Sequence, residues 1–186
     1  RARGTAGSSP LRACGPAPAA VHRLPPSAAR HLTPPCTVGV EGFRPKAVLG
    51  KRGSGRMGRS PEVAMFAARQ AFEASRLDIR PMAEDVGVLV ASGVGGIEVI
   101  ERNVLALYNQ GPRRVSPFTV PSMIIDMPAG AIAIDCGAKG VNYAITSACA
   151  SSGHALGESV EWTRRRAAWA VVPGATGSSI PNLHSA

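Results

Sequence analysis

The sequence predicts an α/β domain in which helices cover a buried sheet. Val86 to Ala91 is a short, almost entirely apolar run, which is typical of a strand covered on both faces. Two further β-prone runs follow it, and segments with helical periodicity separate the three. Strands that alternate with helices favour a layered architecture with the sheet inside. At 186 residues the chain is long enough for one domain with a substantial core, and it shows no internal repeat.

The first predicted helix begins with an N-cap and a proline. Ser60 has a side chain suited to the N-cap, and Pro61 suits the first helical position, where a missing N–H does no harm. The helical pattern continues to about Leu77. Five residues of one face are predicted to point inward: Val63, Phe66, Ala67, Ala71 and Ala74.

A glycine-rich turn, residues 92–96, follows the first apolar run. Its spacing matches neither the dinucleotide-binding pattern nor the P-loop, so we expect a packing turn rather than a phosphate site. The next helix is predicted to run from this turn to about Asn109, where Gly111 and Pro112 stop it. Its apolar face consists of Ile97, Ile100, Val104 and Leu107.

The rest of the chain predicts a broken helix and three further elements. Pro121 begins an apolar helical stretch towards Cys136, which Pro128 and Gly130 interrupt. After it we expect a strand over residues 141–146, a helix over residues 149–166 and a strand over residues 167–172.

The net charge of +9 is concentrated at the N-terminus. Residues 1–36 hold five arginines, no acidic residue and seven of the 16 prolines. Such a stretch buries too little apolar surface to offset its chain entropy, so a disordered tail is predicted over residues 1–36. The domain is expected over residues 37–180, followed by a short tail over residues 181–186. An Arg-rich, acid-free start also fits an organelle transit peptide, which is the second interpretation.

Composition excludes several classes of function. Residues 37–186 carry 16 basic and 12 acidic residues, without the basic stripe and the aromatic residues of a nucleic-acid surface. No apolar run approaches the length of a membrane span. The four cysteines (Cys14, Cys36, Cys136 and Cys149) lack the pairing of a zinc site and the density of a disulfide scaffold. We therefore expect no nucleic-acid or membrane partner, no metal or other cofactor, and a cytoplasmic location.

Cys149 is the residue that suggests chemistry. It lies where a predicted strand gives way to a helix, so its sulfur would face the positive end of the helix dipole and free backbone N–H groups, which stabilise a thiolate. The alternative is a small buried residue, the usual fate of a free cysteine. Position alone leaves both interpretations open. The neighbours are small and leave room for a substrate: Ala148, Ala150, Ser151, Ser152 and Gly153.

Three segments together carry a family resemblance. They are Ser92-Gly93-Val94-Gly95-Gly96, Gly111-Pro112-Arg113-Arg114-Val115-Ser116-Pro117-Phe118-Thr119-Val120-Pro121-Ser122, and Ser147-Ala148-Cys149-Ala150-Ser151. In order and spacing they resemble the β-ketoacyl-acyl-carrier-protein synthases, the condensing enzymes of fatty-acid synthesis in the thiolase superfamily. The family's segments read Ser-Gly-Ile-Gly-Gly, Gly-Pro-Arg-Lys-Ile-Ser-Pro-Phe-Phe-Val-Pro-Ser and Thr/Ser-Ala-Cys-Ala/Thr-Ser/Thr. The resemblance covers residues 37–180 and implies a thiolase-like layered α-β-α fold.

The resemblance also implies an activity and a nucleophile. Such enzymes condense an acyl thioester with malonyl-carrier protein by decarboxylative Claisen chemistry. Cys149 stands at the position that accepts the acyl group, and its backbone N–H at the position of one oxyanion donor.

Further residues take their expected roles from the same resemblance. Val94 and Thr119 match positions that contact the acyl chain, and Thr119 replaces the usual aromatic residue. Arg113 and Arg114, and less securely Arg56, match basic positions that meet the acidic acyl carrier protein. Residues 116–133 resemble the family's dimer-forming region, so a homodimer is expected.

Part of the family's machinery has no counterpart here. Its two catalytic histidines and the supporting lysine lie in the C-terminal half, and its opening strand and glycine turn have no match in residues 1–36. His154 follows Cys149 by five residues, which at about 100° per residue places it well round the helix from the thiol, so we expect it to pack or to face a neighbouring element. The expected chain is therefore the N-terminal half of such an enzyme, a fragment unable to condense substrates alone.

Three alternatives remain at the level of sequence. A ketosynthase of polyketide assembly shares the same motifs. A non-catalytic partner subunit that shapes a pocket is the candidate from another class, although such subunits usually lack the nucleophile that Cys149 provides. An inactive gene fragment is the third.

Overall fold

The computed structural model describes residues 21–23, 36–38, 49–50 and 57–177 of the chain. The chain divides into two units, Arg1–Arg44 with Asn182–Ala186, and Pro45–Pro181. In the first unit, strand β1 (Val21–Arg23) pairs antiparallel with strand β2 (Cys36–Val38). The rest of residues 1–36, and residues 181–186, lie outside the described residues, so the domain boundaries stay a prediction.

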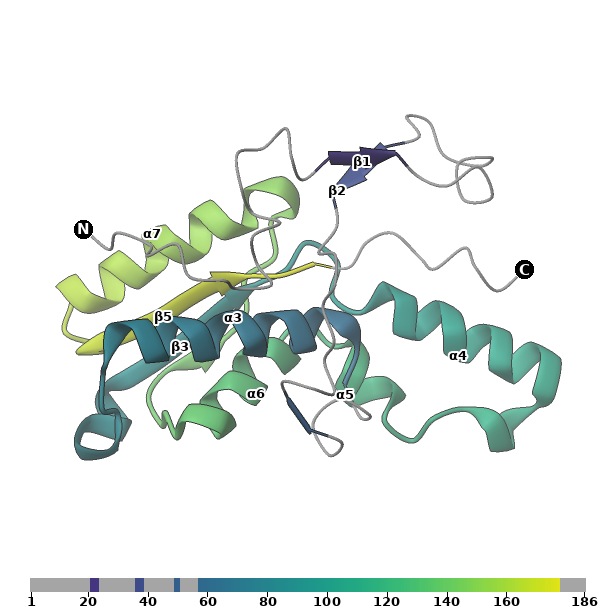
Figure 1. Cartoon of the computed structure of the whole chain (residues 1–186), viewed down its shortest axis with the longest axis horizontal. Helices are drawn as coiled ribbons and strands as arrows, with labels where there is room; N and C mark the ends of the chain where they lie inside the picture. Colours follow the sequence, from purple (N-terminus) through teal and green to yellow (C-terminus); the bar gives the residue numbers. More distant parts are fainter. Residues whose placement is uncertain (1–20, 24–35, 39–48, 51–56, 178–186) are drawn as a thin grey trace. The chain divides into compact units, whose positions relative to one another are not determined.

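The second unit is built on a parallel sheet of three described strands, in the order β4-β3-β5. The central strand β3 (Val86–Ala91) pairs with β4 (Asn142–Tyr143) and along its whole length with β5 (Ala170–Ala175). Figure 1 shows β3 and β5 side by side. The predicted α/β class is therefore confirmed, although β3 alone among these three strands is buried along its whole length.

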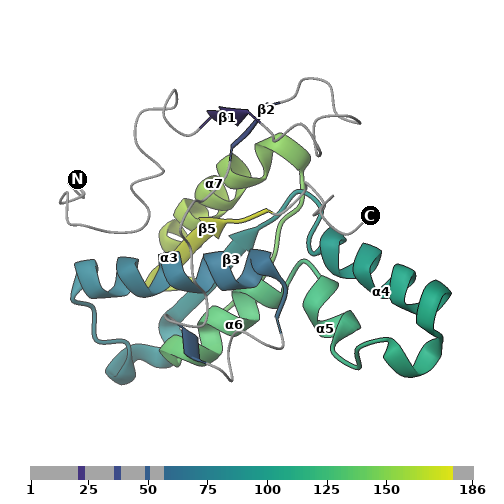
Figure 2. The same cartoon turned by 45° about the vertical axis from the view of Figure 1, so that its right-hand side comes forward.

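Helices cover both faces of β3. Val88 and Val90 pack against α3 (Arg59–Ser75) and α6 (Met127–Cys136), whereas Leu89 and Ala91 pack against α7 (Ser151–Arg164). Figures 1 and 2 show α7 on one side of the sheet and α6 on the other. Because side chains alternate along a strand, an all-apolar run fits this two-sided burial, as the sequence predicted.

Helix α3 begins and faces differently from the prediction. Gly58 rather than Ser60 is the N-cap, and no side chain caps the helix. The buried face holds Pro61, Ala64, Met65 and Ala68, at the spacing of one helical stripe. Of the residues predicted to point inward, Phe66 is buried and Val63 half-buried, but the three alanines are exposed: Ala67, Ala71 and Ala74. Alanine is common on both the buried and the exposed faces of helices, so the alanines of α3 do not show which of its faces points inward.

Glycines in the turn after β3 allow two backbones to approach closely. A Cβ atom on Gly96 would lie 2.5 Å from the Ser122 carbonyl oxygen, and one on Gly95 would lie 2.8 Å from that of Met123. Gly95 also has φ of +75°, a conformation that favours glycine. This contact agrees with the expected packing turn.

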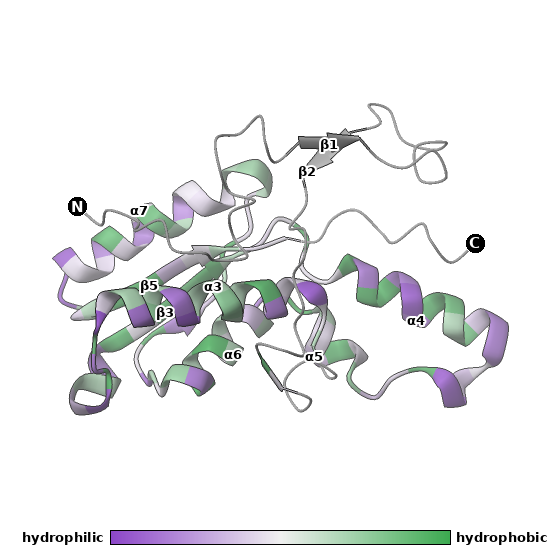
Figure 3. Cartoon of the chain, in the orientation of Figure 1, coloured by the Kyte–Doolittle hydropathy of each residue, from purple (hydrophilic) through white to green (hydrophobic). Residues whose placement is uncertain are grey.

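Helix α4 (Ile97–Gln110) ends at Gly111 as predicted, with the Gly111 N–H bonded to the Leu107 carbonyl. Its buried residues are Val99 and Asn103, and the Asn103 side chain accepts a hydrogen bond from the Ser116 N–H at 2.9 Å. The predicted apolar face exists, and Figure 3 shows hydrophobic residues repeated along α4. All four of its residues are exposed: Ile97, Ile100, Val104 and Leu107.

The next segment forms two short helices, and the second of them has a proline in its first turn. Helix α5 (Thr119–Met123) ends at Ile124, and α6 begins anew with Pro128 in its first turn. Pro128 and Gly130 were predicted to interrupt a helix, but the first turn of α6 has no need of the N–H that Pro128 lacks, and Gly130 lies inside α6. Arg69 of α3 donates hydrogen bonds of 2.8 and 2.6 Å to Asp135 and so links α3 to α6.

The last three predicted elements have shifted or shorter boundaries. β4 covers two residues of the predicted strand, although backbone bonds from Val88 N–H to Val141 and from Ser92 N–H to Ile145 continue the pairing. β5 starts three residues later than predicted and includes Pro173. A proline is tolerated there because, among the described strands, β5 is at the sheet's edge. The predicted helix start at Cys149 is a short 3₁₀ turn, η5 (Ala148–Ala150), before α7.

Within the described part of the chain, no helix is long and apolar enough to cross a membrane. Nor do the described residues contain a group of three or more His, Cys, Asp or Glu side chains that could hold a metal ion.

Candidate active site around Cys149

Cys149 lies in η5, between the end of the β4 segment and the first turn of α7, and its side chain is exposed. The segment before Cys149 is hydrogen-bonded to the end of β3 and the turn that follows it. The Ile145 carbonyl accepts a hydrogen bond from the Ser92 N–H at 3.1 Å, and the Thr146 hydroxyl donates to the Gly93 carbonyl at 3.1 Å. The predicted position, at the junction of a strand and a helix, is therefore observed.

A pocket of about 240 Å³ opens beside Cys149. Three segments form its wall: the end of β3, the end of β5, and the start of α7 with η5. The residues that line it are Ala91, Ser92, Gly93, Ala148, Cys149, Ser151, Ser152, Ala175, Thr176 and Gly177. Two of the small neighbours expected to leave room, Ala150 and Gly153, are outside this lining.

The pocket sits where parallel strands end. β3 and β5 run in the same direction, so their carboxyl ends meet at one edge of the sheet, the usual place for ligands in open α/β folds. Thr176 closes the β5 side, with its N–H bonded to the Ala91 carbonyl at 2.9 Å and its hydroxyl donating to the Ser60 carbonyl at 2.9 Å. Sequence inspection missed this wall, although the two strands predicted to end at residues 91 and 172 were its signal.

The backbone next to the thiol presents donors. The Ser151 N–H bonds to the Ala148 carbonyl and the Ala150 N–H to the Ser147 carbonyl, whereas the Cys149 N–H meets no acceptor among the residues that the structure describes. Cys149 also directly precedes Ala150, the N-cap of the 14-residue helix α7, where the helix dipole is positive. This arrangement can stabilise negative charge on the sulfur and on an oxygen bound next to it.

Ser147 and His154 form a contact that sequence inspection did not find. Ser147 Oγ and His154 Nδ1 are 2.6 Å apart, which joins the loop before Cys149 to the first turns of α7. The expectation that His154 faces a neighbouring element is correct, and that element is the loop that carries the thiol. Ser147 and His154 are seven residues apart, and because Ser147 lies in a loop, helical periodicity in the sequence could not indicate their contact.

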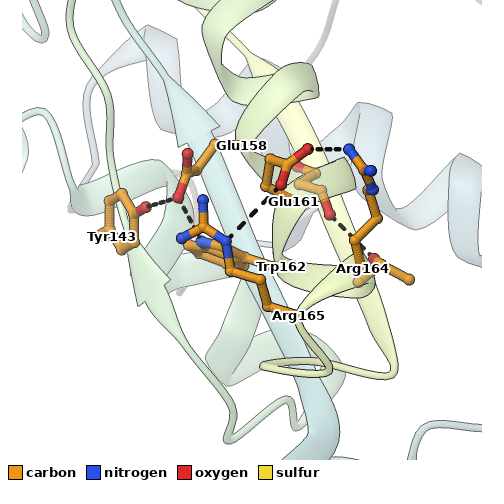
Figure 4. Close-up of polar contacts among 8 residues, drawn as sticks. Tyr143, Glu158, Glu161, Trp162, Arg164 and Arg165 are labelled. Carbon is orange, nitrogen blue, oxygen red and sulfur yellow. Dashed lines mark hydrogen bonds and ion pairs between the residues drawn. The ribbon is translucent and has the colours of Figure 1, made fainter.

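A polar and aromatic cluster attaches α7 to the sheet (Figure 4). The Glu158 carboxylate accepts hydrogen bonds from the Trp162 indole N–H at 3.0 Å and from the Tyr143 hydroxyl at 3.5 Å. The Tyr143 and Trp162 ring centroids are 4.9 Å apart with a tilt of 60°. Partial burial, with the nearby Glu158 charge, raises the pKa of Tyr143. Trp162 itself is buried, so this cluster fixes the helix that begins beside Cys149.

Comparison with known proteins places this site in a family. Residues 36–185 match the family described as β-ketoacyl synthase, N-terminal domain. The chain belongs to the β-ketoacyl synthase family.

Two curated relatives carry the name 3-oxoacyl-[acyl-carrier-protein] synthase 2. The protein from Staphylococcus aureus is 40% identical over 136 residues, which make up 73% of this chain and 34% of that protein. The protein from Synechocystis is 35% identical over 145 residues, which make up 77% of this chain and 35% of that protein. The chain therefore spans about a third of the length of these β-ketoacyl synthases.

Solved ketosynthase structures share the fold. A ketosynthase bound to a hexaketide and to a type II PKS acyl-carrier protein matches 77% of this chain and 42% of its own with a TM-score of 0.69 at 22% identity. A β-ketoacyl synthase from Burkholderia phymatum matches 78% of this chain and 36% of its own with a TM-score of 0.64 at 23% identity. These similarities confirm the thiolase-like layered fold expected from the sequence.

The two predicted acyl-chain residues of this β-ketoacyl synthase domain lie outside the pocket lining. Val94 follows Gly93 directly and is 51% exposed. Thr119 begins α5, and its hydroxyl donates to the Ser116 carbonyl at 2.6 Å. Their roles stay a prediction, because the described pocket is bounded without them.

The predicted carrier-binding residues lie in another part of the domain. Arg113 and Arg114 belong to η4 (Pro112–Arg114), the 3₁₀ turn after α4, and both are exposed. Neither forms an ion pair with any residue that the structure describes. Arg56 lies outside the described residues.

Proposed function

We propose that this domain supplies the acyl-accepting site of a 3-oxoacyl-[acyl-carrier-protein] synthase. The supporting observation is an exposed thiol at the rim of a pocket, near the start of a helix and with a backbone N–H that meets no acceptor among the described residues. In the proposed step the Cys149 thiolate attacks the carbonyl carbon of an acyl thioester. The bond between the acyl carbon and the carrier sulfur breaks, the carrier leaves as a thiolate that takes up a proton, and the acyl group stays on Cys149 as a new thioester.

The second half of the proposed reaction is a carbon–carbon bond formation. Malonyl-carrier protein loses carbon dioxide, the resulting carbanion attacks the acyl-Cys149 carbonyl, and Cys149 leaves as a thiolate. This half needs donors that stabilise the malonyl enolate, which the family resemblance assigns to two histidines. The described histidines are His22, in strand β1 of the first unit, and His154, whose Nδ1 is already hydrogen-bonded to Ser147. We therefore propose that this domain contributes acyl transfer, and that decarboxylation depends on residues beyond those described.

A fatty-acid rather than a polyketide substrate is proposed from sequence similarity. The relatives at 35–40% identity are 3-oxoacyl-carrier-protein synthases, whereas the polyketide ketosynthase is 22% identical. We propose that the acyl chain passes Val94 and Thr119. The backbone of Val94 continues the pocket wall that Gly93 forms. In Val94→Trp the range of acyl lengths transferred to Cys149 should narrow, as a comparison of donors of different length would show.

A homodimer and a reducing cytoplasmic location are further parts of the proposal. The support for the dimer is the apolar surface of α4 together with Phe118, Val120 and Ile124, all of them exposed. Sedimentation velocity of the chain tests it. The support for a reducing location is that Cys136 and Cys149 are free thiols.

Alkylation of the cysteines tests the proposed nucleophile. Iodoacetamide at neutral pH should modify Cys149 much faster than Cys136, as measured by peptide mass mapping over time. Cys136 is a matched control, since it is half-buried and burial raises the pKa of its thiol. An acyl-carrier-protein thioester should then leave an acyl group on Cys149, and none on the Cys149→Ser variant. Alkylation of Cys149 no faster than that of a small exposed thiol would contradict the proposal.

A further inference from the structure

The residue that precedes the nucleophile has an unusual backbone. Ala148 has φ of +50°, in the left-handed region that residues with a Cβ atom rarely adopt. The two other described non-glycine residues with positive φ, Arg76 and Arg166, follow the ends of helices, where this conformation is common. A conformation of this kind costs on the order of 1–3 kcal/mol and persists where surrounding contacts enforce it.

Hydrogen bonds hold the backbone on both sides of Ala148. The Ser147 N–H donates to Ser151 Oγ at 2.9 Å, and the Ser151 hydroxyl donates to the Ala148 carbonyl at 2.7 Å. The Thr146 hydroxyl bonds to Gly93 at the end of β3. The loop is thus attached to α7 on one side and to β3 on the other.

The Ser147–His154 contact adds a side-chain link to the same loop. With a separation of 2.6 Å, either the Ser147 hydroxyl donates to Nδ1 or the Nδ1–H donates to Ser147 Oγ. His154 is held by α7, which the Trp162 cluster fixes to the sheet. Ser147 precedes Cys149 by two residues, so the link restrains the peptide units whose rotation would turn the thiol away from the pocket.

We propose that Ser147 and His154 are a positioning pair for Cys149. The pair holds Ala148 in its left-handed conformation, and through it the thiol and the Cys149 N–H at the rim of the pocket. This inference rests on the proposed function, since it needs Cys149 to be the acyl acceptor. Neither residue takes part in bond making. His154 acts through Ser147, which occupies the nitrogen that faces the loop.

The rate of Cys149 alkylation across a range of pH tests the pair in the full chain. Ser147→Ala and His154→Ala should each slow the thiolate reaction roughly tenfold, a size expected when a reactive group loses its orientation. The double variant should be no slower than the single variants, because both remove one contact. Ser147→Thr keeps the hydroxyl and should restore the rate. Thr163→Ala removes another side-chain bond of α7, remote from the pocket, and serves as the control.

The outcomes of this experiment distinguish failure of the positioning pair from failure of the proposed function. If wild-type Cys149 reacts no faster than a small exposed thiol, the proposed function fails, and the positioning pair fails with it. If wild-type Cys149 is fast and both single variants are equally fast, the function stands and the pair is overturned. Three further outcomes also overturn the pair. The losses of alkylation rate in the single variants add in the double variant, or Ser147→Thr does not restore the rate, or the loss of rate matches an equal loss in the free energy of unfolding.

Discussion

Gly87, in β3, leaves little room for a side chain. A Cβ atom there would lie 3.0 Å from the Val141 carbonyl oxygen and 3.1 Å from the Trp162 ring. We expect Gly87→Ala to destabilise the chain by about 1–3 kcal/mol, because the sheet or α7 must move to admit the methyl group. Urea unfolding followed by circular dichroism measures this.

Gly130 provides the matched control for this change. It lies inside α6, and a Cβ atom there meets nothing within 4 Å. Gly130→Ala should stabilise the chain by about 0.5–1 kcal/mol, because alanine loses less backbone entropy than glycine in a helix. Equal effects of the two substitutions would show that Gly87 is not closely packed.

Glu62, in the first turn of α3, carries a buried carboxyl. Desolvation by burial raises its pKa above the ordinary value of 4.5; nearby Arg59 opposes this and Glu98 adds to it. A carboxyl that binds its proton more tightly in the folded state loses stability as pH rises from 4.5 through its folded pKa. Glu62→Gln should therefore be more stable than wild type at pH 7, and the difference should shrink towards pH 4.

Thermal unfolding of both proteins at several pH values checks this expectation. Glu73→Gln, on the exposed face of the same helix, is the control, and its difference from wild type should not follow the same course. A Glu62→Gln variant that is less stable than wild type at pH 7 would refute the prediction.

Single residues show where sequence inspection succeeds and where it stops. Cys149 could be placed at a strand–helix junction because apolar and helical patterns meet there. The contact of Ser147 with His154, and Thr176 at the pocket, could not be predicted, because both depend on how separate segments meet in space. Polar residues of this kind have no periodicity that would identify their partners.

At the scale of elements, α7 depends on one large side chain for its attachment to the sheet. Trp162 is buried against Leu89 and Ala91, and its indole N–H is bonded to Glu158. Trp162→Ala should destabilise the chain by about 3–5 kcal/mol, through lost burial and the cavity left behind. Trp169, the other tryptophan, is 61% exposed, and Trp169→Ala should change stability by less than about 1 kcal/mol.

Equilibrium unfolding in urea compares the two tryptophan variants. Each keeps one tryptophan, so its fluorescence reports on a different site of the same fold. Similar losses of free energy in both variants would contradict the attachment of α7 through Trp162.

The predicted elements differ from the observed ones mostly where tertiary contacts decide. β3 has the predicted bounds, since six consecutive apolar residues leave little ambiguity. β4 is shorter because it pairs with β3 alone among the described strands. The inward face of α3 was misplaced because Ala64 and Ala67 are equivalent in composition, and packing against β3 and α6 chooses between them.

At the scale of the whole molecule, we propose that the exposed Arg113 and Arg114 of η4 meet the acyl carrier protein as it approaches. Arg113→Glu with Arg114→Glu should slow acyl transfer from an acidic acyl carrier protein by roughly tenfold at low salt, because reversed charges repel the partner. Transfer from a small acyl thioester, which needs no docking surface, should be unchanged.

Acylation of Cys149 by the two donors, followed by mass spectrometry, measures this difference. Lys139→Glu is the control, because it reverses an exposed charge elsewhere in the domain. Equal slowing with both donors would place the two arginines in the chemistry or the folding of the site instead of in docking.

Pro173 determines what the described edge of the sheet can accept from other molecules. β5 keeps full register with β3 through this residue, so the N–H that proline lacks belongs to the outward side of the strand. A strand from another molecule that pairs with this side of β5 would therefore lack one backbone hydrogen-bond donor. The opposite described edge strand, β4, is two residues long, which also leaves little backbone for pairing. Fibril growth by strand addition is therefore disfavoured at both described edges of the sheet. Aggregation of this chain should instead proceed through exposed apolar surfaces of its helices.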